Sequence, residues 1–301
     1  MSRIGIDLGG TKIEIIVLGQ NKDTLLRRRV ATPSGDYAAT LHAIADLVKN
    51  AEREIKLPRL PIGVSMPGAI SRASGLVKNS NSTCLIGKPF QKDLEGLLER
   101  PVRLENDANC FVLSESIDGA ASEARLVFGV ILGTGVGGGI VVDRKVVVGP
   151  NAITGEWGHN SLPWMSGGEH PGPDCYCGKN GCIETFLSGP ALARDFKNKS
   201  GREAFPENLE VLTRDGDRDA ECVLEIYEDR LARALSGVIN ILDPEVIVLG
   251  GGVSNLERLY ANVPKLWAKY VFSDRVDTVL RKAKYGDSSG VRGAAWLWPE
   301  S

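Results

Sequence analysis

The sequence predicts an α/β protein with two domains and an internally duplicated plan, from three observations. Apolar, β-branched segments that end in glycine turns alternate with segments of helical periodicity, which is typical of α/β proteins. The chain has 301 residues, about twice the length of a typical domain of about 150 residues. Two segments with the pattern strand, glycine turn, strand begin at residues 3 and 126, which indicates a duplicated architecture.

The first of these segments covers residues 3–18, and the second covers residues 126–148. Each has a threonine, Thr11 or Thr134, inside its turn. Glycine lets the backbone approach a phosphate so that several N–H groups converge on it, so we expect both turns to bind phosphate, with tight hairpins without a ligand as the alternative. Residues 133–138 also match the dinucleotide fingerprint, but another strand and not a helix follows, which excludes that interpretation.

The remaining elements follow from periodicity and from turn residues. The pattern predicts a helix over residues 36–55 that is capped by Ser34 or Asp36, and a short strand over 60–64. Further along the chain we expect a helix-permissive segment from Asp107 to Ala121, an irregular loop over 150–185, a helix over 219–242, a strand over 245–249 and a helix from about Ser254.

These elements place a first domain over residues 1–118 and a second domain over residues 119–301. The first domain would contain one phosphate turn, and the second would contain the other turn together with the irregular loop. A C-terminal helix could return to the first domain.

Composition excludes two classes of partner. The 36 basic and 38 acidic side chains give a formal charge of −2, which is too balanced for binding to nucleic acid or a membrane surface through bulk charge.

Asp7 and Lys12 lie where a signal peptide needs an apolar core. The uncharged run at 126–142 contains six glycines and is too short to span a membrane. We therefore expect a cytoplasmic protein.

Three cysteines within eight residues indicate a metal site. Cys175, Cys177 and Cys182 suit three of the four ligands of a tetrahedral Zn²⁺, and a disulfide is disfavoured in a reducing compartment. The chain has only three histidines. One of them, His42, lies on a predicted helix far away in sequence, so His159 or His170 would be the fourth ligand.

Carboxylates near the metal loop and the glycine turns suggest phosphoryl transfer to an alcohol. Glu156, His159 and Glu184 flank the cysteines and could bind the hydroxyls of a sugar. Asp107, beside Asn106, is the candidate general base, with an ordinary carboxylate at a helix N-terminus as the alternative. Asp7 could organise hydrated Mg²⁺, because a buried charge needs a partner. Lys12 could pair with a phosphate or face solvent.

These motifs, taken together and in chain order, resemble those of the ROK family (repressors, open reading frames, kinases). They are IDLGGTK at 6–12, ENDAN at 105–109, GTGVG at 133–137, EWGH at 156–159 and CYCGKNGCIE at 175–184. Three further segments look most like bacterial fructokinases of the mannokinase/fructokinase type: VKNSNST at 77–83, GHNSLPW at 158–164 and GDSSGVRG at 286–293.

The resemblance implies an actin-like, hexokinase-type fold (ribonuclease H-like) with two α/β domains around a cleft that closes on sugar and ATP. It implies that Asp107 is the catalytic base, and that the sugar is bound by Gly68, Asn81, Asn106, Glu156, His159 and Glu184. The residues implied to bind ATP are Asp7, Gly9, Gly10, Thr11, Lys12, Gly133, Thr134, Gly135, Gly137, Gly251 and Gly252. His159 would bind a structural zinc through one ring nitrogen and face the sugar through the other.

The activity implied is ATP-dependent phosphorylation of D-fructose to fructose 6-phosphate by in-line transfer, with Mg²⁺ accompanying ATP. Kinases for mannose, glucose or an N-acetylhexosamine are the alternatives, because epimers differ at single hydroxyls. A sugar-responsive repressor of the same family is a further alternative, although its helix-turn-helix segment is not expected here because the first strand begins at Arg3. The resemblance also implies a homodimer.

Overall fold

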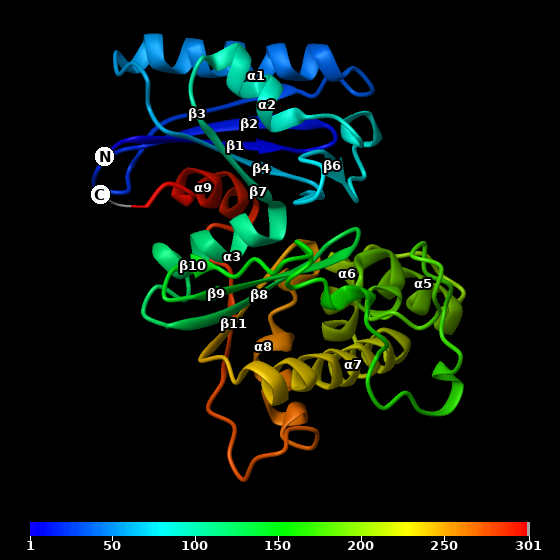
Figure 1. The fold of residues 1–301 in the computed structure, drawn as a ribbon. Helices are drawn as coiled ribbons and strands as arrows, with labels where there is room; N and C mark the ends of the chain where they lie inside the picture. The colour runs from blue at the N-terminus through cyan, green and yellow to red at the C-terminus, as the bar shows by residue number, and fades with distance from the viewer. Residues whose placement is uncertain (300–301) are drawn as a thin grey trace. The chain divides into compact units, whose positions relative to one another are not determined.

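The computed structural model describes residues 1–299, which divide into two compact units (Figure 1). Unit 1 contains Met1–Ser122, Val141–Thr154 and the C-terminal segment from Asp287, and unit 2 contains Glu123–Ile140 and Gly155–Gly286. Each unit is described by itself below, and the domain limits expected from the sequence stay a prediction.

Unit 1 is built on a five-stranded sheet with the order β3-β2-β1-β4-β7. Strand β1 pairs antiparallel with β2 and parallel with β4, and β4 pairs parallel with β7. The strands are β1 Arg3–Leu8, β2 Lys12–Leu18, β3 Thr24–Ala31, β4 Ile62–Met66 and β7 Val102–Asn106, and a separate two-stranded sheet consists of β5 Ala69–Ile70 and β6 Val77–Lys78. The predicted strand, turn and strand at 3–18 is therefore confirmed, and the strand expected at 60–64 lies two residues later.

Four helices belong to unit 1: α1 Tyr37–Ile55, α2 Phe90–Leu98, α3 Asp107–Ile117 and α9 Ser289–Trp296. Asp36 caps α1, because its carboxylate accepts a hydrogen bond from the Ala39 N–H at 2.9 Å, which decides between the two predicted caps. Apolar residues of α1 and α2 pack on the sheet in one core. Burial of each large apolar side chain stabilises such a core by about 1.5–3 kcal/mol.

Helix α9 packs closely on α3, β1 and β4 (Figure 1). A Cβ atom at Gly5 or Gly63 would overlap a backbone carbonyl of α9, and one at Gly293 would overlap the carbonyl of Cys110 in α3. Glycine is therefore required at these three positions for backbones to approach this closely. The C-terminal end of the chain thus completes the packing of unit 1.

The second five-stranded sheet has the order β10-β9-β8-β11-β12. Its strands are β8 Leu126–Leu132, β9 Val136–Val142, β10 Lys145–Val146, β11 Val246–Gly250 and β12 Val279–Lys282. Strand β8 pairs parallel with β11, and β11 pairs parallel with β12. In each sheet three consecutive strands are neighbours, β1–β3 in one and β8–β10 in the other. Two later strands, β4 and β7 or β11 and β12, extend the sheet in parallel from the first strand of that run. The two sheets therefore have the same topology, and the predicted duplication is confirmed.

The helices of unit 2 are α4 Glu184–Leu187, α5 Gly189–Ser200, α6 Pro206–Arg214, α7 Arg218–Leu242 and α8 Arg258–Trp267. Short 3₁₀ turns occur at Thr83–Leu85 in unit 1 and at Trp157–His159, Gly167–Glu169 and Gly252–Asn255 in unit 2, and another spans Gly286–Ser288. Apolar side chains of β8, β11, α7 and α8 form a single core. The predicted helix at 219–242 and strand at 245–249 are confirmed within one residue.

The predicted start of the helix at about Ser254 is wrong. A 3₁₀ turn occupies that position, and α8 begins at Arg258. Leu256 is extended, with φ −71° and ψ 103°, and its side chain is buried in the core of unit 2. The chain turns to bury Leu256 before the helix begins. Among residues 1–299, no helix combines the length and the apolar character needed to cross a membrane.

Candidate functional site

The first glycine turn joins β1 to β2 in unit 1. The Gly9 N–H donates to the Lys12 carbonyl at 3.0 Å. The hydroxyl of Thr32 donates to the Gly9 carbonyl at 2.8 Å, and that of Ser34 donates to the Gly10 carbonyl at 3.1 Å. Gly10 is exposed, and a Cβ built there would meet no atom within 4 Å. Hydroxyl groups therefore fix the back of the turn while its tip stays open to a ligand.

Asp7 precedes this turn on β1 and is paired with a residue that the sequence analysis missed. The Ser65 hydroxyl, in β4, donates to Asp7 Oδ1 at 2.6 Å, and the two residues are opposite each other in the parallel register. Burial raises the pKa of the Asp7 carboxyl, although the hydrogen bond from Ser65 opposes this. A cation bound there would also favour the charged form. Ser65 could have been found as the one polar residue of the segment IGVSM.

Asn106 and Asp107 lie where β7 ends and α3 begins. The side-chain carbonyl of Asn106 caps α3 by accepting from the Ala108 N–H at 2.9 Å, and its amide donates to the Gly68 carbonyl at 3.2 Å. Asp107 Oδ1 accepts from the same Ala108 N–H at 2.8 Å. Asp107 is exposed at the helix N-terminus, where a carboxylate is favoured. Gly68, Asn106 and Asp107 are thus brought together within unit 1.

Asn81 lies in a different part of unit 1. It lines a cavity of about 220 Å³, together with Gly10 of the first glycine turn and with Ser34, Ser82 and Thr83. Most of these residues carry hydroxyl or amide groups, which suit a polar ligand. The cavity therefore joins one residue implied to bind sugar to one implied to bind ATP.

The second glycine turn joins β8 to β9 in unit 2. The Gly133 N–H donates to the Gly135 carbonyl at 3.0 Å, and the Gly133 carbonyl accepts from the Gly189 N–H at 2.8 Å. Glu184 Oε2 accepts from the Val136 N–H at 2.8 Å. A Cβ at Gly135 would approach this carboxylate to 2.7 Å. Glu184, expected as a sugar-binding residue, therefore also fastens the second turn.

Gly251 follows β11 and contacts the end of β8. It has a φ of 82°, and a Cβ at this position would overlap the Leu132 carbonyl. Gly252, next to it, has open space around its Cα. The backbone at Gly251 thus lies against Leu132, the last residue before the second glycine turn.

Four predicted metal ligands come together in unit 2. The ligand atoms of His159, Cys175, Cys177 and Cys182 all lie within 4.8 Å of one another. Nδ1 of His159 is 3.6 Å from Cys175 Sγ, and Cys177 Sγ is 3.6 Å from Cys182 Sγ. A tetrahedral zinc with Zn–S bonds of about 2.3 Å and Zn–N bonds of about 2.0 Å separates its ligand atoms by about 3.5–3.8 Å. The donor set and these two distances therefore fit zinc, and the other pairs of ligand atoms lie within 4.8 Å.

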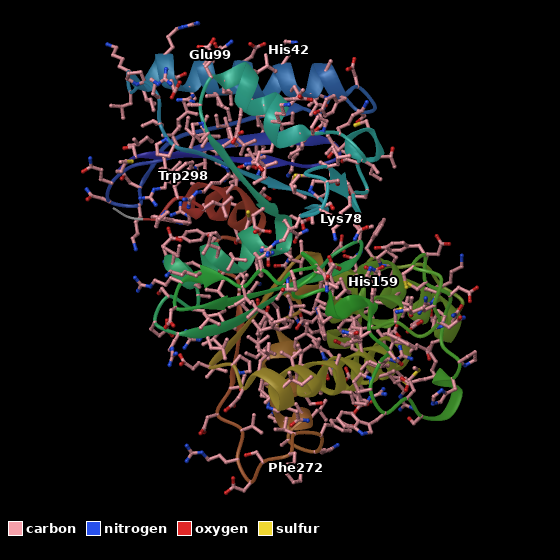
Figure 2. All side chains as sticks on the ribbon, viewed as in Figure 1. His42, Lys78, Glu99, His159, Phe272 and Trp298 are labelled. Atoms are coloured by element: carbon pink, nitrogen blue, oxygen red, sulfur yellow. The ribbon has the colours of Figure 1, made fainter. Side chains whose placement is uncertain are left out.

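The structure distinguishes the two candidate histidines. His170 Nε2 lies 3.1 Å from the Met165 carbonyl, and the four-residue cluster contains His159 instead. His159, labelled in Figure 2, uses Nδ1 toward the cysteines, and its Nε2 lies 2.9 Å from the hydroxyl of Tyr176. Glu156 precedes the 3₁₀ turn that contains His159 and is exposed. One ring nitrogen thus faces the metal cluster and the other faces a hydrogen-bonding group.

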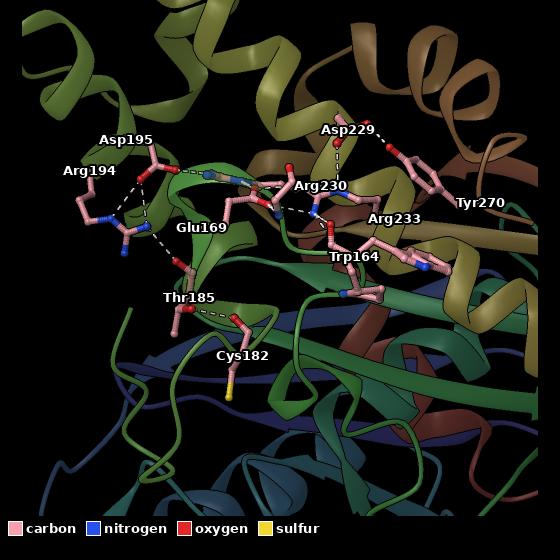
Figure 3. Close-up of polar contacts among 12 residues, drawn as sticks. Trp164, Glu169, Cys182, Thr185, Arg194, Asp195, Asp229, Arg230, Arg233 and Tyr270 are labelled. Carbon is pink, nitrogen blue, oxygen red and sulfur yellow. Dashed lines mark hydrogen bonds and ion pairs between the residues drawn. The ribbon is translucent and has the colours of Figure 1, made fainter. Parts of the chain in front are cut away.

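An ion-pair network fastens the loop before the cysteines to α7 (Figure 3). Glu169 accepts hydrogen bonds from Arg230 and Arg233 at 2.8 Å each. Arg233 also donates to the carbonyls of Pro163 and Trp164 at 3.1 and 3.0 Å. Burial acts to raise the pKa of Glu169, but the two guanidinium groups outweigh it and lower the pKa to about 2. This carboxylate therefore stays ionised at neutral pH and keeps the loop attached.

A second contact holds the end of the loop. Arg194, in α5, donates to the Thr185 carbonyl at 2.9 Å and pairs with Asp195 (Figure 3). The Thr185 hydroxyl in turn donates to the carbonyl of Cys182 at 2.7 Å. Cys182 and Glu184 are therefore positioned by α5 as well as by their own backbone. The ion pairs of Glu169 were not predicted, because Arg230 and Arg233 lie 61 and 64 residues further along the chain.

The residues implied to bind sugar divide between the units. Gly68, Asn81 and Asn106 belong to unit 1, together with Asp107, the implied catalytic base, and Glu156, His159 and Glu184 belong to unit 2. Each group is assembled from several elements of its own unit.

Comparison with known proteins identifies the family of the chain. The model of the ROK family matches residues 3–301. The chain is 38% identical over 297 residues to the N-acetyl-D-glucosamine kinase of Yersinia enterocolitica, with 97% of this chain and 98% of that protein covered.

Two solved structures are similar over nearly the whole chain. The ROK hexokinase from Thermus thermophilus has a TM-score of 0.86 and 32% identity, with 98% of this chain and 97% of that one covered. The ROK family glucokinase from Streptomyces griseus, in complex with glucose and AMPPNP, has a TM-score of 0.77 and 27% identity, with 99% of each chain covered. The chain therefore has the actin-like, hexokinase-type α/β fold and belongs to the ROK family.

Proposed function

We propose that this protein is an ATP-dependent sugar kinase whose substrate is N-acetyl-D-glucosamine. The observation that carries the proposal is the 38% identity to the N-acetyl-D-glucosamine kinase of Yersinia enterocolitica across 97% of the chain. Such identity over the full length supports both the coarse activity, phosphorylation of a hexose by ATP, and the identity of the sugar. It favours the N-acetylhexosamine alternative over the fructose that the sequence motifs suggested.

In the reaction, Asp107 would act as the general base on the sugar hydroxyl that attacks the γ-phosphate. Its exposed carboxylate at the start of α3 can reach a ligand, while the helix N-terminus stabilises its charged form. Asn106 would orient the sugar, because capping and the contact with Gly68 fix its amide. Glu156, His159 and Glu184 would bind further sugar hydroxyls.

The two glycine turns would bind the phosphates of ATP. Phosphoryl transfer depends on N–H donors and positive charge around the transferred group. The open tip at Gly10 and the backbone at Thr134 and Gly135 would supply N–H groups, and Lys12 is exposed beside the first turn. Gly251 and Gly252 would lie by the nucleoside.

Two metal ions belong to this proposal. His159, Cys175, Cys177 and Cys182 would hold a structural zinc, which fixes the tautomer and direction of the imidazole. Asp7, with Ser65, would hold the hydrated Mg²⁺ that accompanies ATP and neutralises phosphate charge. The homodimer implied by the family resemblance stays a prediction.

The test is an ATP-consumption assay with N-acetyl-D-glucosamine, glucose, mannose and fructose, comparing kcat/KM. We expect the highest value for N-acetyl-D-glucosamine, by at least about tenfold, since a site that hydrogen-bonds an amide leaves polar groups unpaired with sugars that lack it. A higher kcat/KM for fructose would reject the proposed sugar and restore the fructokinase hypothesis. Turnover of none of these sugars would reject the kinase itself.

A further inference from the structure

Tyr176 lies between two cysteines of the metal cluster and combines an exposed ring with a fixed hydroxyl. Its side chain is 84% exposed, which leaves the ring free to be covered by a ligand. Yet its hydroxyl lies 2.9 Å from Nε2 of His159, and the two rings pack edge to face, with centroids 5.1 Å apart and an interplanar angle of 89°. An exposed surface tyrosine without a role would not need this orientation.

The direction of the hydrogen bond follows from the metal cluster. Nδ1 of His159 faces the cysteines, 3.6 Å from Cys175 Sγ. An imidazole that binds a metal through Nδ1 carries its proton on Nε2, so Nε2 donates and the Tyr176 oxygen accepts. The phenol proton is then available for a different acceptor. Among residues 1–299, His159 is the only hydrogen-bond partner of the Tyr176 hydroxyl.

Two carboxylates implied to bind sugar belong to the same segment of the chain as this phenol: Glu156 directly precedes the turn that contains His159, and Glu184 begins α4, two residues after Cys182. An ordinary phenol, with a pKa of about 10, keeps its proton at neutral pH. Accepting a hydrogen bond from His159 also polarises the O–H and strengthens it as a donor.

We propose that Tyr176 is a sugar-binding residue, which donates its phenol hydrogen to a sugar oxygen while the hydrogen bond from His159 holds it in place. The proposal rests on the proposed sugar kinase function and changes one role in it: the Nε2 proton of His159 is used to hold Tyr176, so Tyr176 replaces His159 as the donor to the sugar, beside two carboxylates. A sugar hydroxyl is both donor and acceptor. The carboxylates can satisfy its hydrogen, and Tyr176 satisfies its oxygen.

The test is Tyr176→Phe, which removes one oxygen atom and keeps the exposed ring. Tyr37→Phe is the matched control, because the Tyr37 hydroxyl also hydrogen-bonds one side chain, that of Asp93 at 2.7 Å, and is placed outside the proposed site. Both variants are measured with the sugar that the wild type uses best. We record KM for sugar, KM for ATP, kcat, bound zinc and Tm.

For Tyr176→Phe we expect KM for the sugar to rise by about tenfold, the loss of one good hydrogen bond. KM for ATP, kcat, zinc content and Tm should stay close to those of the wild type, and Tyr37→Phe should leave every one of the kinetic constants unchanged. An unchanged or lower KM for the sugar would overturn the proposal, the lower value meaning that Tyr176 competes with the sugar for His159. Loss of zinc would also overturn it, since the role would then be structural.

The experiment distinguishes failure of the proposed function from failure of the role proposed for Tyr176. If the wild type prefers fructose, the N-acetyl-D-glucosamine assignment fails, while the comparison of Tyr176→Phe with wild type is made on fructose and still decides the role of Tyr176. If the wild type phosphorylates no hexose, calorimetric titration of both proteins with the same four hexoses decides it. Equal affinity, or no binding by either protein, then overturns the proposal.

Discussion

The two glycine turns have the same place in duplicated sheets, but they are fastened in different ways. The turn of unit 1 is held by the hydroxyls of Thr32 and Ser34, residues with no expected part in binding sugar. The turn of unit 2 is held by the carboxylate of Glu184, which follows Cys182, a proposed metal ligand, by two residues. In the proposed function, phosphate binding and sugar binding in unit 2 would therefore share a side chain.

This difference has a physical consequence for coupling between substrates. If the four-residue cluster binds zinc, loss of the metal should displace Glu184 and so disturb the second turn. Among residues 1–299, the side chains that hold the first turn are Thr32 and Ser34, which are not part of this cluster. A carboxylate shared between a backbone N–H and a sugar hydroxyl would also be oriented by each contact for the other.

Asp107→Asn should lower kcat by about 100-fold or more, because it removes the general base of the reaction. The substitution changes a residue of unit 1 alone. The content of bound zinc and the KM for the sugar should therefore remain close to those of the wild type. Asp36→Asn is the matched control, since it changes another exposed carboxylate at a helix N-terminus of unit 1 to an equally good cap. Steady-state kinetics measure both, and near-normal turnover of Asp107→Asn would remove Asp107 from the mechanism.

Cys177→Ser should release the metal and raise KM for the sugar by more than about tenfold, because the zinc orients His159. Through Glu184 it should also raise KM for ATP, by a smaller factor. Cys222→Ser, a change of a half-exposed cysteine of α7 outside the cluster, is the control. Metal analysis and kinetics report the result. Full zinc content with unchanged kinetics would contradict the zinc-loop hypothesis.

Glu184→Ala and Glu156→Ala form a pair that tests the shared carboxylate. Both should raise KM for the sugar, but only Glu184→Ala should also raise KM for ATP, by about tenfold, since it leaves the Val136 N–H without its acceptor. The measurement is the KM for each substrate at saturation of the other. Equal effects of the two variants on KM for ATP would mean that the contact between Glu184 and Val136 does not distinguish the second turn from the first.

Gly10→Ala and Gly133→Ala should each raise KM for ATP by a few-fold, about threefold to tenfold, because a methyl group keeps the phosphate from the backbone. Both changes fit the ligand-free chain: a Cβ at Gly10 meets nothing within 4 Å, and one at Gly133 meets its nearest atom at 3.9 Å. Gly96→Ala, with equally open space in α2, is the control. The Tm of the two turn variants should stay close to that of the wild type. If the KM for ATP of one of them does not change, that turn is excluded from phosphate binding.

Local patterns predicted the regular elements best. The strand, turn and strand units, the helix at 37–55 and the long helix at 218–242 follow from apolar periodicity and from caps that act within a few residues. Strand β3 and helices α5 and α6 were not predicted. In β3 only Leu26 of eight residues is buried, because it is an edge strand, so alternation of apolar and polar residues gives no signal there.

Motifs predicted which residues belong to the site better than they predicted how those residues are held. The cysteine spacing indicated three ligands, but it could not choose between His159 and His170, because the distance in space between a histidine and a cysteine cluster is not encoded by their separation in sequence. Ser65 and Tyr176 were missed for the same reason. Ser65 contacts Asp7 on a neighbouring strand, and the orientation of Tyr176 is set by its packing on His159.

Short segments of the sequence were sufficient to predict the α/β class, the duplication, the two glycine turns and the ionisable residues near them, because backbone preference and side-chain chemistry are properties of short segments. Three pairings became visible only in the folded chain: His159 joins the cysteine cluster, Glu184 fastens the second turn, and Glu169 holds the loop before the cysteines to α7. Those pairings depend on where distant segments meet in the folded core, and burial then fixes each polar group to the partner that satisfies it.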